Sequence, residues 1–462
     1  MWCVIFQQYY LACLSHASYL IGDETSGRAV VVDPQRDVSE YLADAAEHAL
    51  SIERVIETHF HADFVSGHLE LAQATGASIC YGEAADADYA IERLADGQRV
   101  SLGDVELEVR STPGHTPESI SIVVYEHGGD QVPYGVLTGD TLFIGDVGRP
   151  DLLTSEGVGA AELARYLYRS LHDRILTLPD ATRVYPAHGA GSACGKNLST
   201  ETVSTVGEQR RTNYALQPMS EDAFVALVTE GQPLTPAYFS FSAHRNRELH
   251  DLLGEHEPPQ PLPLEDVITL QVAGAVVLDT RPAADFAAGH LMGSLNVGLE
   301  GRFAEYAGDV VRSDQPIVLV CEPEHELEAK VRLARIGFDE VVGHLDEPQR
   351  VFMEHPDLVA RSSRLTADEL DRRRHDVPDL QVVDVRNPGE LDRGTIPGAV
   401  NLPLASLLVR CDELDRSRPT VVYCAGGYRS SIAASLLAAG GFSDVSDILG
   451  GYEAWALAAA RG

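Results

Sequence analysis

Two kinds of apolar pattern alternate in the first half of the chain. Short runs rich in β-branched residues occupy 29–32, 54–56, 119–125 and 135–137, and stretches of helical period cover 38–48 and 160–171. Short apolar runs bounded by turn residues favour strands, whereas a period of 3.6 residues favours amphipathic helices. We therefore predict that residues 1–256 form one domain of mixed α/β structure.

The second half contains an internal repeat. V-L-D-T-R-P at 277–282 returns as V-V-D-V-R-N at 382–387, and an apolar run ending in cysteine at 317–321 returns at 421–424. In each copy these two runs are followed by an Ala/Leu-rich helical stretch, which predicts an α/β fold with a parallel sheet. Two copies of one domain are expected.

Linker-like segments set the expected boundaries. The stretch 257–263 is rich in proline, and a polar stretch around 355–364 precedes Thr366, from which a helix is expected to start. The predicted domains are 1–256, 257–360 and 361–462, in keeping with about 150 residues per domain.

The charge is strongly negative. Lys+Arg number 35 against 70 Asp+Glu, a net charge of −35, and Lys196 and Lys330 are the only lysines. Such a field disfavours nucleic acid and anionic membrane surfaces as partners, and it suits either a salty cytoplasm or simple solubility. No apolar run approaches the ~18 residues that span a bilayer, and the first residues lack a charged signal-peptide region, so a cytoplasmic location is expected.

Cysteine usage points to reactivity rather than to cross-links. The seven cysteines are scattered, odd in number and without a C-x-x-C pair. Neither a disulfide framework nor a zinc knuckle is indicated.

Potential metal ligands cluster where strands are expected to end. H-F-H-A-D-F follows the run 54–56, and three further ligands stand in the motifs G-H, G-D and A-H. In chain order the candidates are His59, His61, Asp63, His115, Asp140 and His188. Any one of them alone could be a polar turn residue, but the whole order predicts a metal site.

This order of motifs resembles the metallo-β-lactamase fold, an αββα sandwich that usually holds two metals. The second metal of that fold needs a histidine directly after the motif aspartate, where this chain has Phe64. An apolar ring cannot coordinate, so the second site is left with Asp63, His188 and a shared Asp140. This departure from the pattern weakens an interpretation as a dinuclear zinc hydrolase.

The first domain also resembles persulfide dioxygenases through F-Q-Q-Y at 6–9, E-T-H-F-H-A-D at 57–63, and G-D-T-L-F with G-R-P-D-L at 139–152. That resemblance implies one Fe(II) held by His59, His115 and Asp140. Two imidazoles and one carboxylate leave open positions on one face for a substrate sulfur and dioxygen. The other three motif residues, His61, Asp63 and His188, would orient ligands and water or act as alternative ligands.

Two charged residues of this resemblance, Arg149 and Asp151, lie in the G-R-x-D segment. They could form an ion pair that shapes the substrate pocket, or they could contact the substrate directly.

A cysteine near the end of the chain lies between an expected strand and an expected helix. The run 421–423 leads into C-A-G-G-Y-R-S-S at 424–431. Backbone N–H groups and the helix dipole would stabilise the Cys424 thiolate there, and Arg429 adds a guanidinium that can hold a sulfur oxyanion. The loop residues expected to bind substrate are Gly426, Gly427, Tyr428 and Ser430.

The last copy resembles rhodanese, a sulfurtransferase whose loop cysteine cycles through a persulfide. D-V-R at 384–386, Glu390 and G-T-I-P-G-A at 394–399 carry the resemblance. In the middle copy Cys321 is followed by E-P-E-H-E, which supplies negative charge and a proline where N–H donors are needed. That copy is predicted to be degenerate, a spacer or a docking surface.

Cys194 lies just after the A-H motif, in a segment that resembles bacterial fusions of a persulfide dioxygenase with two rhodanese-type domains. The resemblance implies that Cys194 can carry sulfur near the iron, and Lys196 could lower its pKa. A small residue in a glycine-rich turn is the alternative.

The expected function is Fe(II)-dependent oxidation of a low-molecular-weight persulfide, such as glutathione persulfide, by O2 to sulfite. Sulfur transfer through Cys424 would make or use thiosulfate, and a homodimer is expected from the family alone. The alternatives are a zinc thioester hydrolase of the hydroxyacylglutathione type and a non-catalytic persulfide-binding adaptor.

Overall fold

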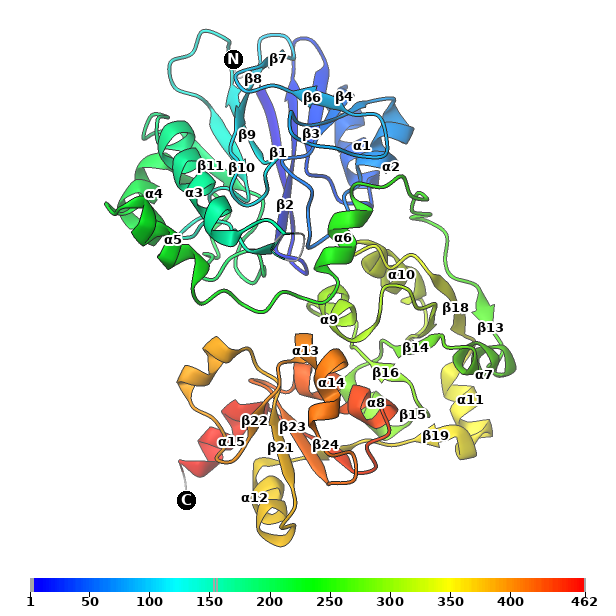
Figure 1. Ribbon diagram of the computed structural model, residues 1–462. Helices are drawn as coiled ribbons and strands as arrows, with labels where there is room; N and C mark the ends of the chain where they lie inside the picture. Colours follow the sequence, from blue (N-terminus) through cyan, green and yellow to red (C-terminus); the bar gives the residue numbers. More distant parts are fainter. Residues whose placement is uncertain (1–3, 153, 155–156, 461–462) are drawn as a thin grey trace. The chain divides into compact units, whose positions relative to one another are not determined.

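A computed structural model describes residues 4–152, 154 and 157–460, which form two compact units (Figure 1). One unit contains the chain up to Thr235 together with Phe239–Leu253. The other contains Pro236–Tyr238 and the chain from Gly254 onward. The three predicted domain ranges stay a prediction.

The first unit is built on two six-stranded sheets. The first sheet has the order β1 (Val4–Leu11), β2 (His16–Asp23), β3 (Arg28–Val32), β4 (Ser51–Ile56), β5 (Ser78–Gly82) and β6 (Glu92–Leu94). The second has the order β12 (Ser204–Thr205), β11 (Arg183–Pro186), β10 (Gly135–Gly139), β9 (Ile120–Tyr125), β8 (Glu106–Ser111) and β7 (Arg99–Ser101).

Both faces of the first sheet are apolar because successive side chains of a strand point to opposite sides. In β3, Val30 and Val32 join a core shared with the second sheet, whereas Ala29 and Val31 join the cluster on the other face. Each sheet therefore needs a cover on its outer face.

Helices supply these covers. Residues of α1 (Ser39–Glu47) and α2 (His68–Thr75) join the outer cluster of the first sheet. Residues of α3 (Ala160–Ser170) and α5 (Glu221–Thr229) pack on the second sheet. The unit also contains two short helices, α4 (Val206–Thr212) and α6 (Phe239–Arg245). The predicted αββα sandwich is confirmed.

The second unit holds two parallel five-stranded sheets with the same strand order. The first is β13 (Pro261–Leu262), β18 (Val341–Leu345), β17 (Ile317–Val320), β14 (Val276–Asp279) and β16 (Leu295–Asn296). The second is β20 (Ser363–Leu365), β24 (Val445–Ile448), β23 (Thr420–Tyr423), β21 (Gln381–Asp384) and β22 (Val400–Asn401). The two predicted parallel α/β copies are confirmed.

Helices flank each sheet. The middle copy has α7 (Leu264–Val272), α8 (Ala283–Ala288), α9 (Phe303–Val310), α10 (Glu326–Ala334) and α11 (Pro348–Glu354), and a two-stranded ladder of β15 (His290–Leu291) with β19 (Val359–Ala360). The last copy has α12 (Ala367–Asp376), α13 (Leu404–Arg410), α14 (Tyr428–Ala439) and α15 (Gly451–Ala459). As predicted, a helix starts after Thr366, whose side chain forms a capping box with Glu369.

The repeated Asp-x-Arg motif is a buried brace in both copies. In the last copy Arg386 donates from Nε to Asp384 at 2.9 Å and from a terminal nitrogen at 2.6 Å. Arg281 and Asp279 of the middle copy form the same pair, with distances of 3.0 and 2.6 Å. The repeat in the sequence therefore marks a structural element.

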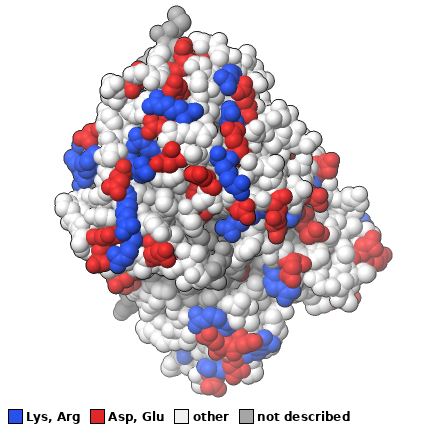
Figure 2. Space-filling model, turned by 45° about the horizontal axis from the view of Figure 1, so that its top comes forward, with Lys and Arg blue, Asp and Glu red and all other residues white. Residues whose placement is uncertain are grey.

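Charged side chains of both signs are interspersed on the face shown in Figure 2. Within the described residues, no helix is long and apolar enough to cross a membrane.

Candidate metal centre and sulfur-transfer site

The predicted metal ligands meet at one edge of the sandwich. Each follows the end of a strand or precedes the next one: the loop 57–67 follows β4, the loop before β9 carries His115, and Asp140 and His188 follow β10 and β11. All six predicted residues are buried. The strand ends thus bring together side chains that are far apart in the sequence.

Three of them form a compact set. One ligand atom each of His59, His115 and Asp140 lies within 4.8 Å of the others. Asp140 Oδ2 is 3.4 Å from His115 Nε2 and 3.9 Å from His59 Nε2. Two imidazoles and one carboxylate match the facial arrangement that suits Fe(II).

Hydrogen bonds orient both imidazoles toward this point. His115 Nδ1 donates to the carbonyl of Arg149 at 2.8 Å, which leaves Nε2 without a proton. His59 Nδ1 is 3.0 Å from the hydroxyl of Thr58. That hydroxyl donates its one proton to Asp33, so it accepts from His59, whose Nε2 is left bare as well.

The electrostatics of the set also fit a cation. Burial lowers the pKa of His59 well below its ordinary value and lowers that of His115 to about 4, so both rings are neutral. Burial raises the pKa of Asp140 to about 6. Among the described residues, none forms a hydrogen bond with His59 Nε2, and such buried nitrogens call for a partner.

The Nε2 side of the His61 ring lies next to two carboxylates outside this set. Its Nε2 is 3.1 Å from Asp33 Oδ1 and 3.4 Å from Glu57 Oε2. Burial alone would lower the pKa of His61, but these carboxylates raise it well above its ordinary value. The motifs in the sequence assign no role to Asp33 or Glu57, although Asp33 directly follows a β-branched run, the same signal that marks the other ligands.

A second set of possible ligands consists of His61, Asp63 and His188. His188 Nε2 is 3.3 Å from Asp63 and 3.4 Å from the second oxygen of Asp140, which therefore lies between the two sets. Phe64 is buried, with its ring centroid 4.4 Å from that of His61. In this second set, the His61 imidazole also contacts the carboxylates of Asp33 and Glu57, and the apolar ring of Phe64 lies beside it.

Arg149 and Asp151 form an ion pair beside the loops that carry the predicted metal ligands. Arg149 donates from Nε and a terminal nitrogen to Asp151 at 2.7 and 2.8 Å, and to the carbonyl of Ala193 at 3.1 Å. The Arg149 side chain is buried. The sequence leaves two roles possible for these residues, an ion pair or direct contact with the substrate, and the structure contains the ion pair.

Cys194 lies beside the metal set. Its thiol groups with Asp140 and His188 as a third possible ligand cluster. Burial raises the pKa of Cys194 well above its ordinary value, and Asp63 and Asp140 raise it further. The idea that Lys196 lowers this pKa is wrong, because the Lys196 ammonium donates to the carbonyls of Leu227 and Glu230 instead.

The Cys424 loop has the expected cradle form. Cys424 follows β23, and the N–H of Gly427 points at its sulfur at a distance of 3.1 Å. Ser430 Oγ lies 3.6 Å from the sulfur at the start of α14. Gly427 has φ of +105°, a conformation that side chains rarely adopt. Gly426 is exposed, with open space around its Cα.

Arg429 is paired within the protein. Its two terminal nitrogens donate to the two oxygens of Glu390 at 2.6 and 2.7 Å. Burial alone would raise the pKa of Glu390, but the hydrogen bonds from Arg429 lower it below its ordinary value. In the sequence Glu390 only contributes to the resemblance to rhodanese, and its distance from the loop along the chain gives no signal of this contact.

Tyr428 points away from its own loop. Its hydroxyl contacts two backbone carbonyls of the middle copy, those of Gly298 at 2.6 Å and Glu300 at 3.0 Å. Because these bonds occupy the Tyr428 hydroxyl, the predicted contact with the substrate would have to come from the Tyr428 ring.

The middle copy lacks the anion cradle. Burial raises the pKa of Cys321 to about 12, and carboxylates surround its loop. A cavity of about 950 Å³ beside this loop includes Glu322, His325 and Glu328, with Tyr428 of the last copy in its wall. These features agree with the prediction that the copy has lost the cysteine chemistry.

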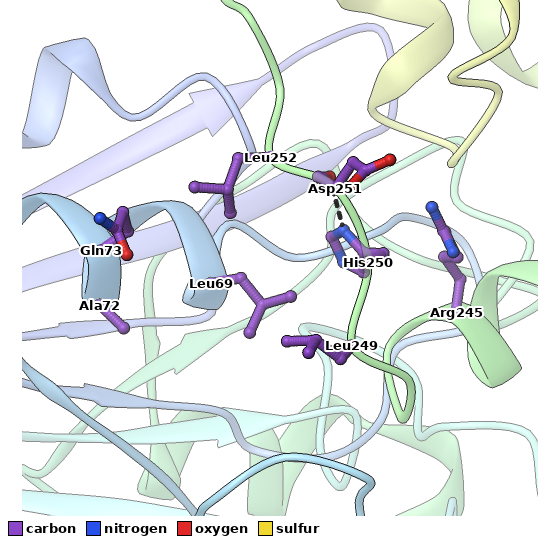
Figure 3. A pocket seen from close by; sticks show the side chains of 8 residues that line it. All are labelled: Leu69, Ala72, Gln73, Arg245, Leu249, His250, Asp251 and Leu252. Carbon is purple, nitrogen blue, oxygen red and sulfur yellow. Dashed lines mark hydrogen bonds between the residues drawn. The ribbon is translucent and has the colours of Figure 1, made fainter.

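A separate hollow of about 600 Å³ lies between α2 and the segment 249–252 (Figure 3). Leu249 and Leu252 are exposed there, and His250 Nδ1 donates to the carbonyl of Asp251. None of the predicted site residues lines it.

Comparisons with known proteins agree with this geometry. The profile of the Metallo-beta-lactamase superfamily matches residues 11–188, and that of the Rhodanese-like domain matches 264–347 and 366–458. The chain is 33% identical over 233 residues to "Persulfide dioxygenase ETHE1, mitochondrial" of Bos taurus, which covers 50% of this chain and 82% of that protein.

Two further matches widen the comparison. "Hydroxyacylglutathione hydrolase cytoplasmic" of Arabidopsis thaliana is 33% identical over 183 residues, or 39% of this chain and 66% of that protein. The crystal structure of a metallo-beta-lactamase from Staphylococcus aureus subsp. aureus COL superposes with a TM-score of 0.67 at 32% identity, covering 74% of this chain and 98% of that one. The chain belongs to the persulfide dioxygenase family of the metallo-β-lactamase superfamily, in a form that carries two rhodanese-like domains.

Proposed function

We propose that the first domain oxidises the terminal sulfur of a low-molecular-weight persulfide, such as glutathione persulfide, to sulfite, and that Cys424 transfers sulfane sulfur. The overall reaction converts the persulfide, O2 and water into the thiol, sulfite and two protons. One observation carries the proposal: His59, His115 and Asp140 converge as two neutral imidazoles and one carboxylate, while His61 is tied to Asp33 and Glu57.

The three residues would hold one Fe(II), which when bound supplies the redox chemistry that activates O2. The protein's own part is to keep the ligands in place. The Arg149 carbonyl and the Thr58 hydroxyl hold the two rings in the right tautomer. The side chains around the set are buried, which excludes bulk water from the reacting sulfur.

Cys194 is the nearest candidate for a sulfur carrier in this domain. Its neutral thiol faces Asp140 and can donate a hydrogen bond to it. Ligand atoms of Cys194, Asp140 and His188 lie within 4.8 Å of one another, so the thiol is beside a residue that would hold the metal, which supports a role in holding or relaying sulfur.

In the last copy, the Gly427 N–H and the N-terminus of α14 stabilise negative charge on the Cys424 sulfur. Attack by this thiolate on the outer sulfur of thiosulfate forms a cysteine persulfide and releases sulfite, and the reverse step makes thiosulfate. Covalent linkage raises the local concentration of the sulfite that the domains share. A cytoplasmic location and a homodimer stay predictions.

The test is O2 uptake by the Fe(II)-reconstituted protein with glutathione persulfide, with sulfite and thiosulfate quantified for the wild type and Cys424→Ser. We expect uptake in both proteins, with thiosulfate from the wild type and sulfite from the variant. Lack of uptake with one iron bound per chain would refute the oxidation.

The zinc thioester hydrolase is the second candidate, because His61, Asp63 and His188 form a second ligand set near the first. Hydrolysis of a glutathione thioester by the zinc-loaded protein, at two metal ions per chain, would favour it. Binding of persulfide without turnover would favour the adaptor instead.

A further inference from the structure

The middle copy packs against the start of α14, directly beside the Cys424 loop. The backbone N–H of Asn296 donates to Ser435 Oγ at 2.9 Å, and Tyr428 is held by the carbonyls of Gly298 and Glu300. Helix α9 of the middle copy also contacts α13 and α14 of the last copy. Hydrogen bonds with the degenerate copy therefore hold Tyr428, the first residue of α14, and Ser435 farther along the same helix.

Tyr306, on α9, reaches this loop from the middle copy. Its ring meets that of Tyr428 edge-on, with centroids 5.4 Å apart and planes at 77°. Within the described part of the chain, the Tyr306 hydroxyl has no hydrogen-bond partner. Tyr306 is half-buried, and a phenol hydroxyl that has no partner in the protein can donate its proton to a bound ligand.

The surroundings of Tyr306 indicate the charge of that ligand. Glu305 and Arg302 interact most strongly with Tyr306 and form an ion pair with each other. Arg429 is close enough to interact electrostatically with both Tyr306 and Cys424. Burial raises the pKa of Tyr306 to about 12, which keeps the phenol neutral and able to donate. A hydroxyl donor and a guanidinium beside a nucleophilic sulfur form a site for an oxyanion.

Resting on the sulfur transfer proposed for Cys424, we propose that Tyr306 is a substrate-binding residue of that site. Its O–H donates a hydrogen bond to a sulfonate oxygen of thiosulfate or sulfite bound next to Arg429. The degenerate copy thus completes the site of the active copy.

The need for a second donor follows from the pairing of Arg429. Glu390 already offsets the guanidinium charge through two hydrogen bonds, and the substrate is a dianion. During the transfer the Cys424 thiolate attacks the outer sulfur of thiosulfate, the S–S bond of thiosulfate breaks, and sulfite leaves with the bonding electrons. Negative charge collects on the sulfonate oxygens as sulfite departs, where Tyr306 would stabilise it.

Steady-state kinetics with thiosulfate as donor and cyanide as acceptor test this. The two half-reactions share only the Cys424 persulfide, so kcat/KM for each substrate reports its own step. Cyanide has no oxygen for Tyr306 to contact. We expect Tyr306→Phe to lower kcat/KM for thiosulfate about tenfold, the value of one hydrogen bond to a charged group, and to leave kcat/KM for cyanide unchanged.

Tyr166→Phe is the matched control, because Tyr166 is an exposed tyrosine of α3 whose hydroxyl lies 3.4 Å from Glu162. It should change neither constant. An unchanged thiosulfate constant in Tyr306→Phe, or an equal loss in both half-reactions, would overturn the inference. Absence of transfer by the wild type, or equal rates for the wild type and Cys424→Ser, would instead overturn the proposed function.

Alkylation of Cys424, followed by mass spectrometry of its peptide, gives a readout that does not depend on turnover. Iodoacetate carries a carboxylate and iodoacetamide does not. Tyr306→Phe should slow the reaction with iodoacetate relative to iodoacetamide several-fold. An unchanged ratio would contradict a hydrogen bond to the anion.

Discussion

The Asp384–Arg386 brace supports a quantitative prediction about the last copy. Asp384 is 1% exposed and Arg386 is 2% exposed, and both the backbone N–H and the guanidinium of Arg386 donate to the Asp384 carboxylate. Arg386 also donates to the carbonyl of Gly394 and lies over the ring of Tyr452 at 4.4 Å. Asp384→Asn removes the charge and turns an amide N–H₂ toward a donor, which leaves the guanidinium buried and uncompensated.

Breaking a buried ion pair by removing one partner costs about 3–5 kcal/mol. With a slope of ~4 kcal/mol/M in guanidinium chloride, the unfolding midpoint should fall by ~1 M. Trp455, on α15, belongs to the last copy, so in a Trp2→Phe background its fluorescence reports the unfolding of that copy. Sulfur transfer should be lost at the same denaturant concentration.

Asp412→Asn is the control, because it breaks an exposed ion pair with Arg416 in the same copy. Surface pairs contribute little, so its midpoint should match that of the wild type. If Asp384→Asn shifts the unfolding midpoint no more than Asp412→Asn does, the buried Asp384–Arg386 pair does not stabilise the last copy as predicted. Asp279→Asn breaks the equivalent brace of the middle copy, and an equal shift there would mean that both copies unfold together.

Three further outcomes are expected. Burial raises the pKa of metal-free Asp140 to about 6, so protons should compete with iron and iron affinity should fall as the pH drops below that value, measured by iron retention. In the metal-free protein the same shift should lower stability as pH rises from ~4 to ~6, measured by thermal melts. Cys321→Ser should leave thiosulfate sulfurtransferase activity unchanged, whereas Cys424→Ser should lose it; a comparable loss in both would contradict a degenerate middle copy. Phe64→His should raise the metal content from one toward two ions per chain by elemental analysis, and a constant content would show that Phe64 does not limit the second site.

Much of this architecture could be predicted from local patterns. The αββα sandwich and the parallel copies follow from alternating apolar runs, and the metal residues follow from polar positions at strand ends, which a sheet brings to one edge. The helix start at Thr366 was visible because capping depends on residues three positions apart. Cys424 was visible because its loop joins a strand directly to a helix.

Contacts that depend on side-chain direction or on packing between copies could not be predicted in this way. His61 has two ring nitrogens, and the sequence does not reveal that one of them faces Asp33 and Glu57. Glu390 reaches Arg429 across a long stretch of chain. No local pattern connects them, so only the folded arrangement shows these pairs.

The internal comparison of the two copies explains why a degenerate domain can matter to the chemistry. Both copies have the Asp-x-Arg brace with nearly equal distances, so the middle copy has an intact frame. Its Cys321 loop nevertheless carries carboxylates and a proline in place of an anion cradle. The intact frame positions α9 against the last copy, where the Tyr306 ring contacts the ring of Tyr428, the residue before Arg429. Substitutions in the middle copy should therefore affect sulfur transfer through this contact and not through Cys321.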